Sequence, residues 1–430
     1  MSYRGLAIPT SNGSSAPSIP YPVAPPVPSA AAPRVGPASE AGSGRSVASS
    51  HAHHVRYVRS ASQIRGIPVD VAATLSDVAK RYVFRANDYY LGLIDWNDPE
   101  DPIRQLVIPR VEELADFGKL DASNEAANTV AQGVQHKYRD TALVLVNSVC
   151  GAYCRYCFRK RLFMDENDET VHDLAPAFAY IGSHPEISDV LLTGGDPLIM
   201  STGKLRAIVE RFAAMPHIRT IRIGSKMPAF NPYRLLEDPS LQALFREFSS
   251  NDRAIYLMAH FDHPRELTPI AREGVICARE NGARVVNQCP IIRGINDDAD
   301  VLAELVTTMT NLGAPQYYLF QCRPTAGNAA YEMPLVRGWK LFESAMQQVS
   351  GLSRRARYCM SHATGKIEVL GVDDDFIYLR YHRAKNPADA GRVMVCHRDD
   401  EAFWFDGLRQ IDLRGAVDSA NAVVAASTVA

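Results

Sequence analysis

The sequence predicts an α/β protein built around a parallel sheet. Its 430 residues are 46% hydrophobic, which is enough to bury a large core. Six apolar runs rich in β-branched residues alternate with helical patterns, and six such units favour a parallel sheet with right-handed crossovers. This alternation alone does not distinguish a curled barrel from a flat, doubly wound sheet. The predicted strands are residues 142–149, 189–193, 219–224, 254–260, 284–289 and 316–321, and the predicted helices are residues 173–183, 202–214, 240–249, 265–281, 298–312 and 335–350.

The ends of the chain differ in composition from this predicted core, which we place at residues 136–350. Residues 1–55 are rich in Pro, Ala, Ser and Gly with one acidic residue, and they predict a disordered tail. His51, His53 and His54 are assigned to that tail rather than to a metal site. The tail does not resemble a secretory signal, and an organellar transit peptide stays open.

Two further regions flank the core. Residues 56–135 carry helical patterns at 69–83 and 110–114, and they predict an N-terminal helical cap. We expect a short C-terminal extension over residues 351–412 and a flexible tail over residues 413–430, which are rich in Ala and Val without periodicity.

The net charge and the cysteine content indicate which classes of binding partner and which cellular compartment to expect. A formal net charge of −2 gives no indication of a nucleic acid or an anionic membrane as partner. No apolar run reaches the roughly 18 residues that cross a bilayer. Five of the eight cysteines are scattered along the chain, unlike a disulfide framework, so we expect a reducing cytoplasm.

Three cysteines follow the first predicted strand at the spacing C-x3-C-x2-C. Cys150, Cys154 and Cys157 can hold three irons of a [4Fe–4S] cluster and leave the fourth iron free to bind a small molecule. The alternatives are three buried thiols or an incomplete zinc site. Zinc usually takes two C-x2-C pairs or nearby histidines, which this segment lacks. The spacing therefore favours the cluster.

A second loop follows the strand at 189–193. Gly194 and Gly195 would let backbone groups approach a ligand closely and, with Asp196, offer hydrogen bonds to its amino and carboxylate ends. An ordinary turn is the alternative. Tyr156, between the second and third cysteines, could lay its ring on an adenine, or it could simply pack the loop.

Further short motifs follow the cysteine loop along the chain. They are Cys157-Phe-Arg-Lys-Arg161, Thr193-Gly-Gly-Asp-Pro-Leu198, Ile221-Arg-Ile-Gly-Ser225, His260-Phe-Asp-His-Pro-Arg-Glu-Leu267, Asn287-Gln288 and Arg293-Gly-Ile-Asn-Asp297. In this order, the motifs resemble the lysine 2,3-aminomutase family of the radical S-adenosylmethionine (SAM) superfamily. The resemblance implies a partial (β/α)6 barrel and an isomerase that moves an amino group between adjacent carbons of a free amino acid. It also implies a [4Fe–4S] cluster, SAM and pyridoxal 5′-phosphate (PLP) as cofactors, and flavodoxin or ferredoxin as electron donor; a homo-oligomer stays open.

The resemblance also implies roles for single residues. Lys366 occupies the place of the family's PLP lysine, and a desolvated lysine can form a Schiff base, although most lysines are solvated surface charges. Arg159 matches the arginine assigned to the substrate α-carboxylate, with a phosphate or a structural ion pair as the alternative partner. Tyr156, Gly194, Gly195 and Asp196 are the residues expected to bind SAM.

Two departures concern the substrate. Lysine-specific members bind the distal ammonium with two aspartates, and Arg323 and Cys359 stand in those places here. A cation beside Arg323 would be repelled, so we expect that lysine is not the substrate and that an acidic amino acid, glutamate or aspartate, fits best. Arg323 could instead pair with Glu368 or hold the PLP phosphate.

Two further departures concern the cofactor and a metal. Thr141 replaces an arginine that helps to hold the PLP phosphate in the family, and Arg139 or Lys137 could substitute for it. Cys396 stands alone where some members have a cysteine cluster, so we expect no structural zinc. Other chemistry on the same barrel (an epimerase, a lyase or a protein-modifying enzyme) and a cluster-bearing sensor stay open.

Overall fold

The computed structural model describes residues 53–164, 169–170 and 173–412. The expected disordered tail, apart from its last residues 53–55, and the expected flexible tail at residues 413–430 lie outside the described residues. No helix among the described residues is long and apolar enough to cross a membrane.

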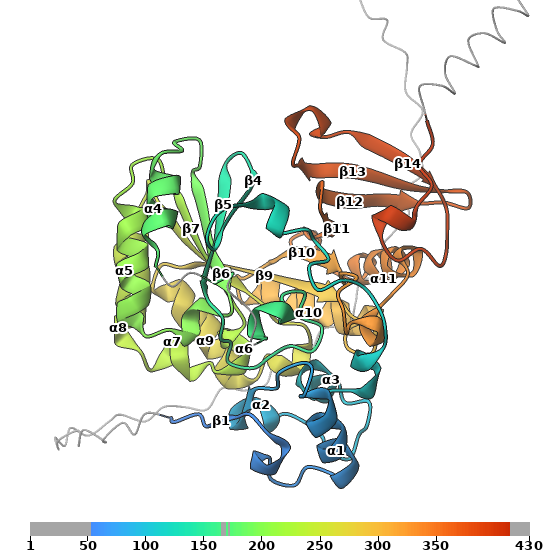
Figure 1. Ribbon diagram of the computed structural model, residues 1–430, viewed down its shortest axis with the longest axis horizontal. Helices are drawn as coiled ribbons and strands as arrows, with labels where there is room; N and C mark the ends of the chain where they lie inside the picture. The colour runs from blue at the N-terminus through green and yellow to red at the C-terminus, as the bar shows by residue number, and fades with distance from the viewer. Residues whose placement is uncertain (1–52, 165–168, 171–172, 413–430) are drawn as a thin grey trace, which may run out of the picture. The chain divides into compact units, whose positions relative to one another are not determined.

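A sheet of twelve strands organises the described residues, and its strands follow the order β14-β13-β12-β11-β10-β9-β8-β7-β6-β5-β4-β3 (Figure 1). The strands from β5 to β11 are parallel, and the strands at both edges are antiparallel. All six predicted strands are present, so the α/β fold is confirmed. Their bounds are β5 (Thr141–Asn147), β6 (Asp189–Gly194), β7 (Thr220–Ser225), β8 (Ala254–Ala259), β9 (Arg284–Ile291) and β10 (Gln316–Gln321).

Helices alternate with these strands, as predicted. Figure 1 shows α4, α5 and α8 along one side of the green strands. Several helices begin at a capping side chain followed by proline: Asp238 accepts a hydrogen bond from the Leu241 amide at the start of α8, and Thr268 does the same for α9. The bounds are α4 (Ala175–Gly182), α5 (Thr202–Ala213), α6 (Met227–Phe230), α7 (Tyr233–Leu236), α8 (Pro239–Phe248), α9 (Pro269–Glu280), α10 (Ala299–Asn311) and α11 (Leu335–Gln347).

The N-terminal region is less helical than predicted. The expected helix at 69–83 ends at Val78, because the following apolar residues Tyr82 and Phe84 enter the core as non-helical chain. The expected helix at 110–114 is a short 3-10 helix. The elements of this region are β1 (Tyr57–Val58), α1 (Val69–Val78), β2 (Ala86–Asn87), α2 (Asp88–Leu91), α3 (Pro102–Val107), β3 (Thr129–Ala131) and β4 (Val134–Tyr138).

Short 3-10 helices occur throughout the described residues. They span Ala61–Gln63, Val111–Leu114, Ala126–Asn128, Lys160–Phe163, Pro197–Ile199, Pro264–Glu266, Ala329–Tyr331, Pro387–Asp389 and Phe405–Gly407.

The C-terminal extension continues the sheet. Its strands are β11 (Arg357–His362), β12 (Gly365–Val372), β13 (Phe376–Ala384) and β14 (Val393–His397), and Figure 1 shows the last three as a red antiparallel ribbon. Gly365 is required where β12 meets β13, because a Cβ there would lie 2.3 Å from the carbonyl oxygen of Arg383. This close pairing brings the Gly365-Lys366 dipeptide against β13.

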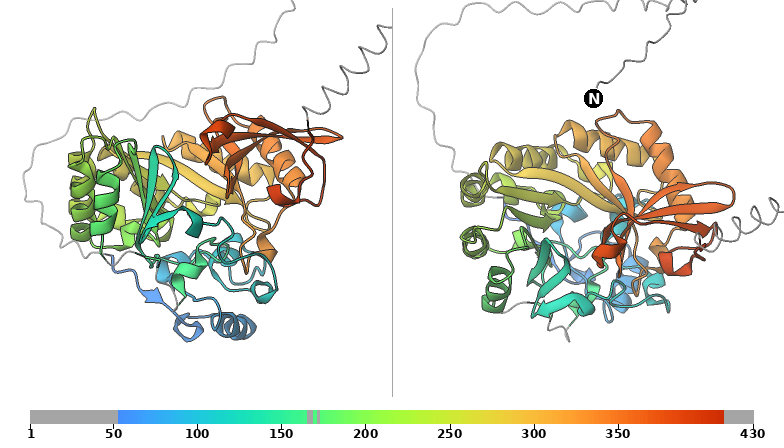
Figure 2. Two further views of the ribbon diagram at one scale, coloured as in Figure 1. Left: turned by 45° about the horizontal axis from the view of Figure 1, so that its top comes forward. Right: turned by 90° about the horizontal axis from the view of Figure 1, so that it is seen from above.

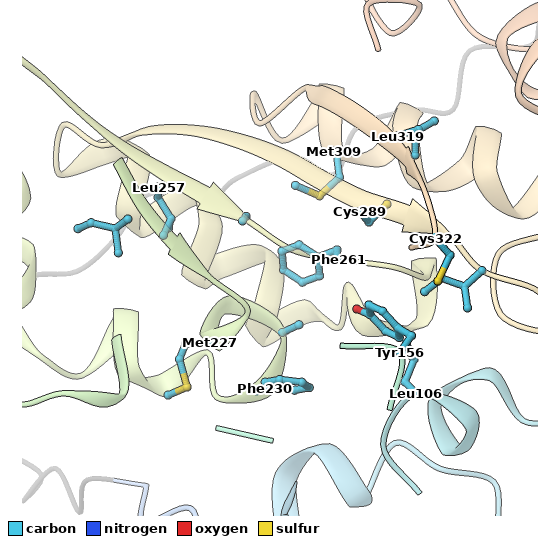
Figure 3. Packing of buried hydrophobic residues seen from close by; sticks show 14 of the residues in the cluster. Leu106, Tyr156, Met227, Phe230, Leu257, Phe261, Cys289, Met309, Leu319 and Cys322 are labelled. Carbon is cyan, nitrogen blue, oxygen red and sulfur yellow. The ribbon is translucent and has the colours of Figure 1, made fainter. Parts of the chain in front are cut away.

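The core continues directly beneath the cysteine loop. The buried apolar cluster includes Tyr156 from that loop, Leu106 from α3 and Cys322 after β10 (Figure 3). The backbone amide of Arg155 donates to the Leu106 carbonyl at 2.9 Å. The Arg155 guanidinium forms an ion pair with Glu113 at 2.7 Å, and both side chains are almost fully buried. The N-terminal region therefore fixes the position of the cysteine loop.

Candidate active site

One cavity of about 340 Å³ is lined by nearly every site residue predicted from the sequence. Its walls come from the ends of the parallel strands, from the cysteine loop and from strands β12 and β13. Cys359 is the one residue of the site expected from the sequence that does not line it; that side chain is buried in β11. The lining includes Cys150, Cys154, Tyr156, Cys157, Arg159, Gly194, Gly195, Asp196, Arg323 and Lys366.

The three cysteines of the loop are free thiols on this cavity. Burial raises the pKa of each thiol, so the sulfurs need a cation, such as iron, to hold them as thiolates. Among the described residues no group of His, Cys, Asp or Glu side chains is arranged to hold a single metal ion. Ligands of a four-iron cluster lie farther apart than ligands of one ion, because each sulfur binds a different iron.

The paired glycines let β6 end tightly against the cysteine loop. A Cβ on Gly195 would lie 2.4 Å from the Asn147 side-chain oxygen and 2.4 Å from the Val149 carbonyl oxygen. The Asp196 carboxylate is buried and accepts hydrogen bonds from the backbone amides of Leu198 at 2.9 Å and Lys226 at 2.7 Å. Asp196 thus joins the ends of β6 and β7, and the backbone of the glycine pair faces the cavity.

Tyr156 belongs to a buried polar network that the sequence did not reveal. Its hydroxyl donates to the Asp262 carboxylate at 2.5 Å and lies 2.8 Å from His260 Nε2. Lys226 Nζ lies 2.6 Å from carboxylate oxygens of both Asp262 and Glu266. Burial would lower the pKa of Lys226, but these two carboxylates raise it above its ordinary value. The network fixes Tyr156 between the cysteine loop and the end of β8.

Arg159 is already paired inside the cavity. Its Nε and Nη2 contact the Glu125 carboxylate, the shortest bond being 2.7 Å, and its Nη1 donates to Thr193 Oγ1 at 3.1 Å. Arg161 contacts the same carboxylate at 2.8 Å. Burial would raise the pKa of Glu125, but the neighbouring guanidinium groups hold it far below its ordinary value. Glu125 lies in a region without a recognisable motif, so the sequence did not indicate it.

Arg323 lies beside this group and has a free donor. Its guanidinium carbon lies 3.6 Å from the centroid of the Phe158 ring, and its buried Nη1 has no hydrogen-bond partner among the described residues. Burial lowers the pKa of Arg323 to about 10, which leaves it charged at neutral pH. The expected alternative partner Glu368 instead contacts Arg357 at 2.9 Å and Arg380 at 2.5 Å. Arg323 therefore presents a positive charge to the cavity.

Lys366 reaches the cavity from β12. Its Nζ lies 3.9 Å from the centroid of the Tyr318 ring, and no carboxylate pairs with it in the described part of the chain. Burial, reinforced by the positive charge of Arg222, lowers the pKa of Lys366 to about 7. Near neutral pH about half of these side chains are unprotonated, which is the form that attacks an aldehyde. The nearby Cys359 thiol is neutral, since burial raises its pKa to about 12.

Comparisons with known proteins agree with this geometry. No family model matches the chain. A protein of Aquifex aeolicus named "Putative L-lysine 2,3-aminomutase" is 50% identical over 358 residues, which cover 83% of this chain and 96% of that protein. The L-lysine 2,3-aminomutases of Fusobacterium nucleatum and Clostridium subterminale are 34% and 33% identical over 61% of this chain, and the matches span 61% and 62% of their lengths. The chain belongs to the lysine 2,3-aminomutase family, whose members are isomerases of the radical SAM type.

Proposed function

We propose that the chain is a PLP-dependent 2,3-aminomutase acting on a free amino acid other than lysine. The observation that carries the proposal is that one cavity is lined both by three free cysteine thiols and by a lysine with a lowered pKa. Homologues of this family use a [4Fe–4S] cluster, SAM and PLP. When bound, these cofactors supply a carbon-centred radical and a π-system that can share its unpaired electron.

The residues present suit these cofactors. Cys150, Cys154 and Cys157 would ligate three irons, and the backbone at Gly194 and Gly195 would approach SAM. Lys366 would hold PLP covalently, because about half of its side chains are unprotonated at neutral pH and it makes no ion pair among the described residues. The aromatic rings of Tyr318 and Phe320 lie 3.9 and 5.4 Å from its Nζ and would exclude water around the attached ring.

The charges of the cavity support a substrate with an anionic far end. Arg159, Arg323 and Lys137 all line it, and Glu125 is the acidic group that faces them. Arg159 would orient the α-carboxylate, sharing its guanidinium fork with Glu125. The free Nη1 of Arg323 would bind a distal carboxylate, and a distal ammonium there would be repelled. Glutamate or aspartate therefore fits better than lysine.

Two expectations from the resemblance complete the proposal. The sheet would curl into a partial (β/α)6 barrel around the cavity; seen from above, the strands turn progressively from teal β5 to orange β10 with helices outside them (Figure 2). An electron would come from a flavodoxin or ferredoxin to the cluster. A radical SAM enzyme of the same barrel with other chemistry is the alternative function.

The proposal is tested by incubating the protein anaerobically with reductant, SAM, PLP and a pool of amino acids. Mass spectrometry then detects isomers of these amino acids. We expect 5′-deoxyadenosine and a β-amino acid from wild type, and no isomer from Lys366→Ala. Lys340→Ala, which removes an exposed lysine, serves as control and should act as wild type. Formation of 5′-deoxyadenosine without any isomer, in wild type loaded with PLP, would favour the alternative chemistry. Absence of SAM cleavage in reduced, cluster-loaded protein would contradict both.

A further inference from the structure

We propose that Arg383 on β13 holds the phosphate of PLP, in place of the arginine that this chain lacks at position 141. The inference rests on the proposed function, since it assumes that Lys366 carries PLP. It adds a residue that neither the sequence motifs nor the named relatives indicate. It also accounts for Thr141, which leaves the usual position without a charge.

The register of the sheet places Arg383 beside the lysine. Lys366 and Arg383 are direct cross-strand partners in the antiparallel pair of β12 and β13, and both line the cavity. Directly opposed residues of such a pair point to the same face of the sheet. In PLP the phosphate-bearing carbon is attached to the ring position next to the aldehyde. A side chain that binds this phosphate must therefore lie beside the lysine that binds the aldehyde.

Arg383 also reaches the position of the missing arginine. Its Nη1 and Nη2 donate to Thr141 Oγ1 at 3.3 and 3.2 Å, and its guanidinium carbon lies 4.2 Å from the centroid of the Tyr138 ring. A second guanidinium at position 141 would meet this one at close range and be repelled. A hydroxyl at position 141 and an arginine at position 383 are therefore compatible. Together they place one positive charge near position 141, where members of the family have an arginine.

The other candidate cations fit less well. Arg139 is exposed and does not line the cavity. Lys137 lines it, but its ammonium donates to the His362 carbonyl, and burial lowers its pKa to about 8. Arg222 lines it but is bound to Asp189, with its Nε 2.7 Å from a carboxylate oxygen.

Arg383 has an acidic partner of its own, and that partner leaves it able to bind an anion. Its Nη2 donates to the Asp140 carboxylate, which is 60% exposed and therefore well solvated. A guanidinium has five N–H donors, so contacts to Asp140 and Thr141 do not exhaust it. The phosphate carries about two negative charges, which a bidentate guanidinium binds with charge-assisted hydrogen bonds.

The test compares PLP with pyridoxal, which has the aldehyde but no phosphate. The full-length protein is stripped of PLP and titrated with either compound, and binding is measured from the visible absorbance of the protein-bound form. The adduct is then trapped with borohydride and mapped by mass spectrometry. The titration is made at a pH well above the pKa of Lys366, because the charge of Arg383 also helps to lower that pKa. In Arg383→Thr we then expect the dissociation constant for PLP to rise roughly 10- to 100-fold and that for pyridoxal to stay unchanged. Arg139→Thr is the matched control and should resemble wild type.

A relocation variant gives the sharper result. The double variant Thr141→Arg, Arg383→Thr returns the guanidinium to β5, and we expect it to regain most of the lost preference for PLP over pyridoxal. An unchanged preference in Arg383→Thr, or an equal loss for both compounds, would overturn the assignment. Labelling of a lysine other than Lys366 in wild type would instead overturn the proposed PLP site, and with it this inference.

Discussion

The lowered pKa of Lys366 predicts how the capture of PLP depends on pH. An ordinary lysine has a pKa of 10.5, and that of Lys366 is about 7, so at pH 7 about one side chain in two is unprotonated instead of roughly one in 3,000. Only the unprotonated amine attacks the aldehyde. We therefore expect the rate of PLP capture to rise about tenfold per pH unit below pH 7 and to level off above about pH 8.

Arg222→Gln should shift this profile. Arg222 is the charged residue that lowers the pKa of Lys366 most, and its removal also leaves the Asp189 carboxylate without the Arg222 ion pair. Both changes favour the protonated amine, so the pKa and the midpoint should rise by about one unit, and capture at pH 6 should slow about tenfold. Arg222→Lys keeps the charge and is the control.

Stopped-flow absorbance measures the rate of PLP capture and gives the midpoint of its pH profile. The measurement runs from about pH 5.5 to about pH 10, a range that distinguishes a lowered lysine pKa from an ordinary one. A wild-type profile that still rises at pH 9 would refute the lowered pKa. A midpoint in Arg222→Gln equal to that of wild type would show that the charge of Arg222 does not act on Lys366.

Three further predictions concern the candidate active site and the buried ion pair that positions the cysteine loop. Replacing the three loop cysteines by alanine should remove bound iron and SAM cleavage together, and iron retained in that variant would contradict the ligand assignment. Glu113→Gln leaves Arg155 buried without its ion-pair partner, so the free energy of unfolding should fall by about 3–5 kcal/mol in a denaturant titration. Glu247→Gln at the exposed pair with Arg206 is the control and should leave it nearly unchanged. Arg323→Asp should lower turnover of glutamate roughly tenfold or more and admit lysine, with Arg323→Lys as the charge-keeping control; wild type that turns over lysine best would contradict the proposed pocket.

The parallel strands and the cysteine loop were predictable because their signals are local. The strand predicted at 142–149 is Thr141–Asn147, and the strand at 316–321 is Gln316–Gln321. Continuous apolar runs identify strands buried on both faces, whatever their neighbours. The N-terminal helix was overextended because Tyr82 and Phe84 have the apolar character of a helix face but are buried as non-helical chain.

The charged half of the site was not predictable from local patterns. Glu125 lies in a segment without a motif, and it reaches Arg159 only through the folded chain, at a separation of 34 residues. Arg383 meets Thr141 across 242 residues, because β4 and β5 at one edge of the cavity face β12 and β13 at the other. Such pairs depend on strand order and register, which one sequence does not specify.

The strand order also separates the site into two parts of the chain that are synthesised at different times. The cysteines leave β5, whereas Lys366 and Arg383 belong to the antiparallel strands added after β11. A chain ending at residue 350 retains the three loop cysteines and the glycine loop but loses both of these side chains. In the proposed function, the residues that would hold the cluster and those that would anchor PLP therefore lie in consecutive parts of the chain, so the C-terminal strands can change without alteration of the three cysteines. A different amine chemistry could evolve in this family by exchange of residues 351–412, which contain these strands.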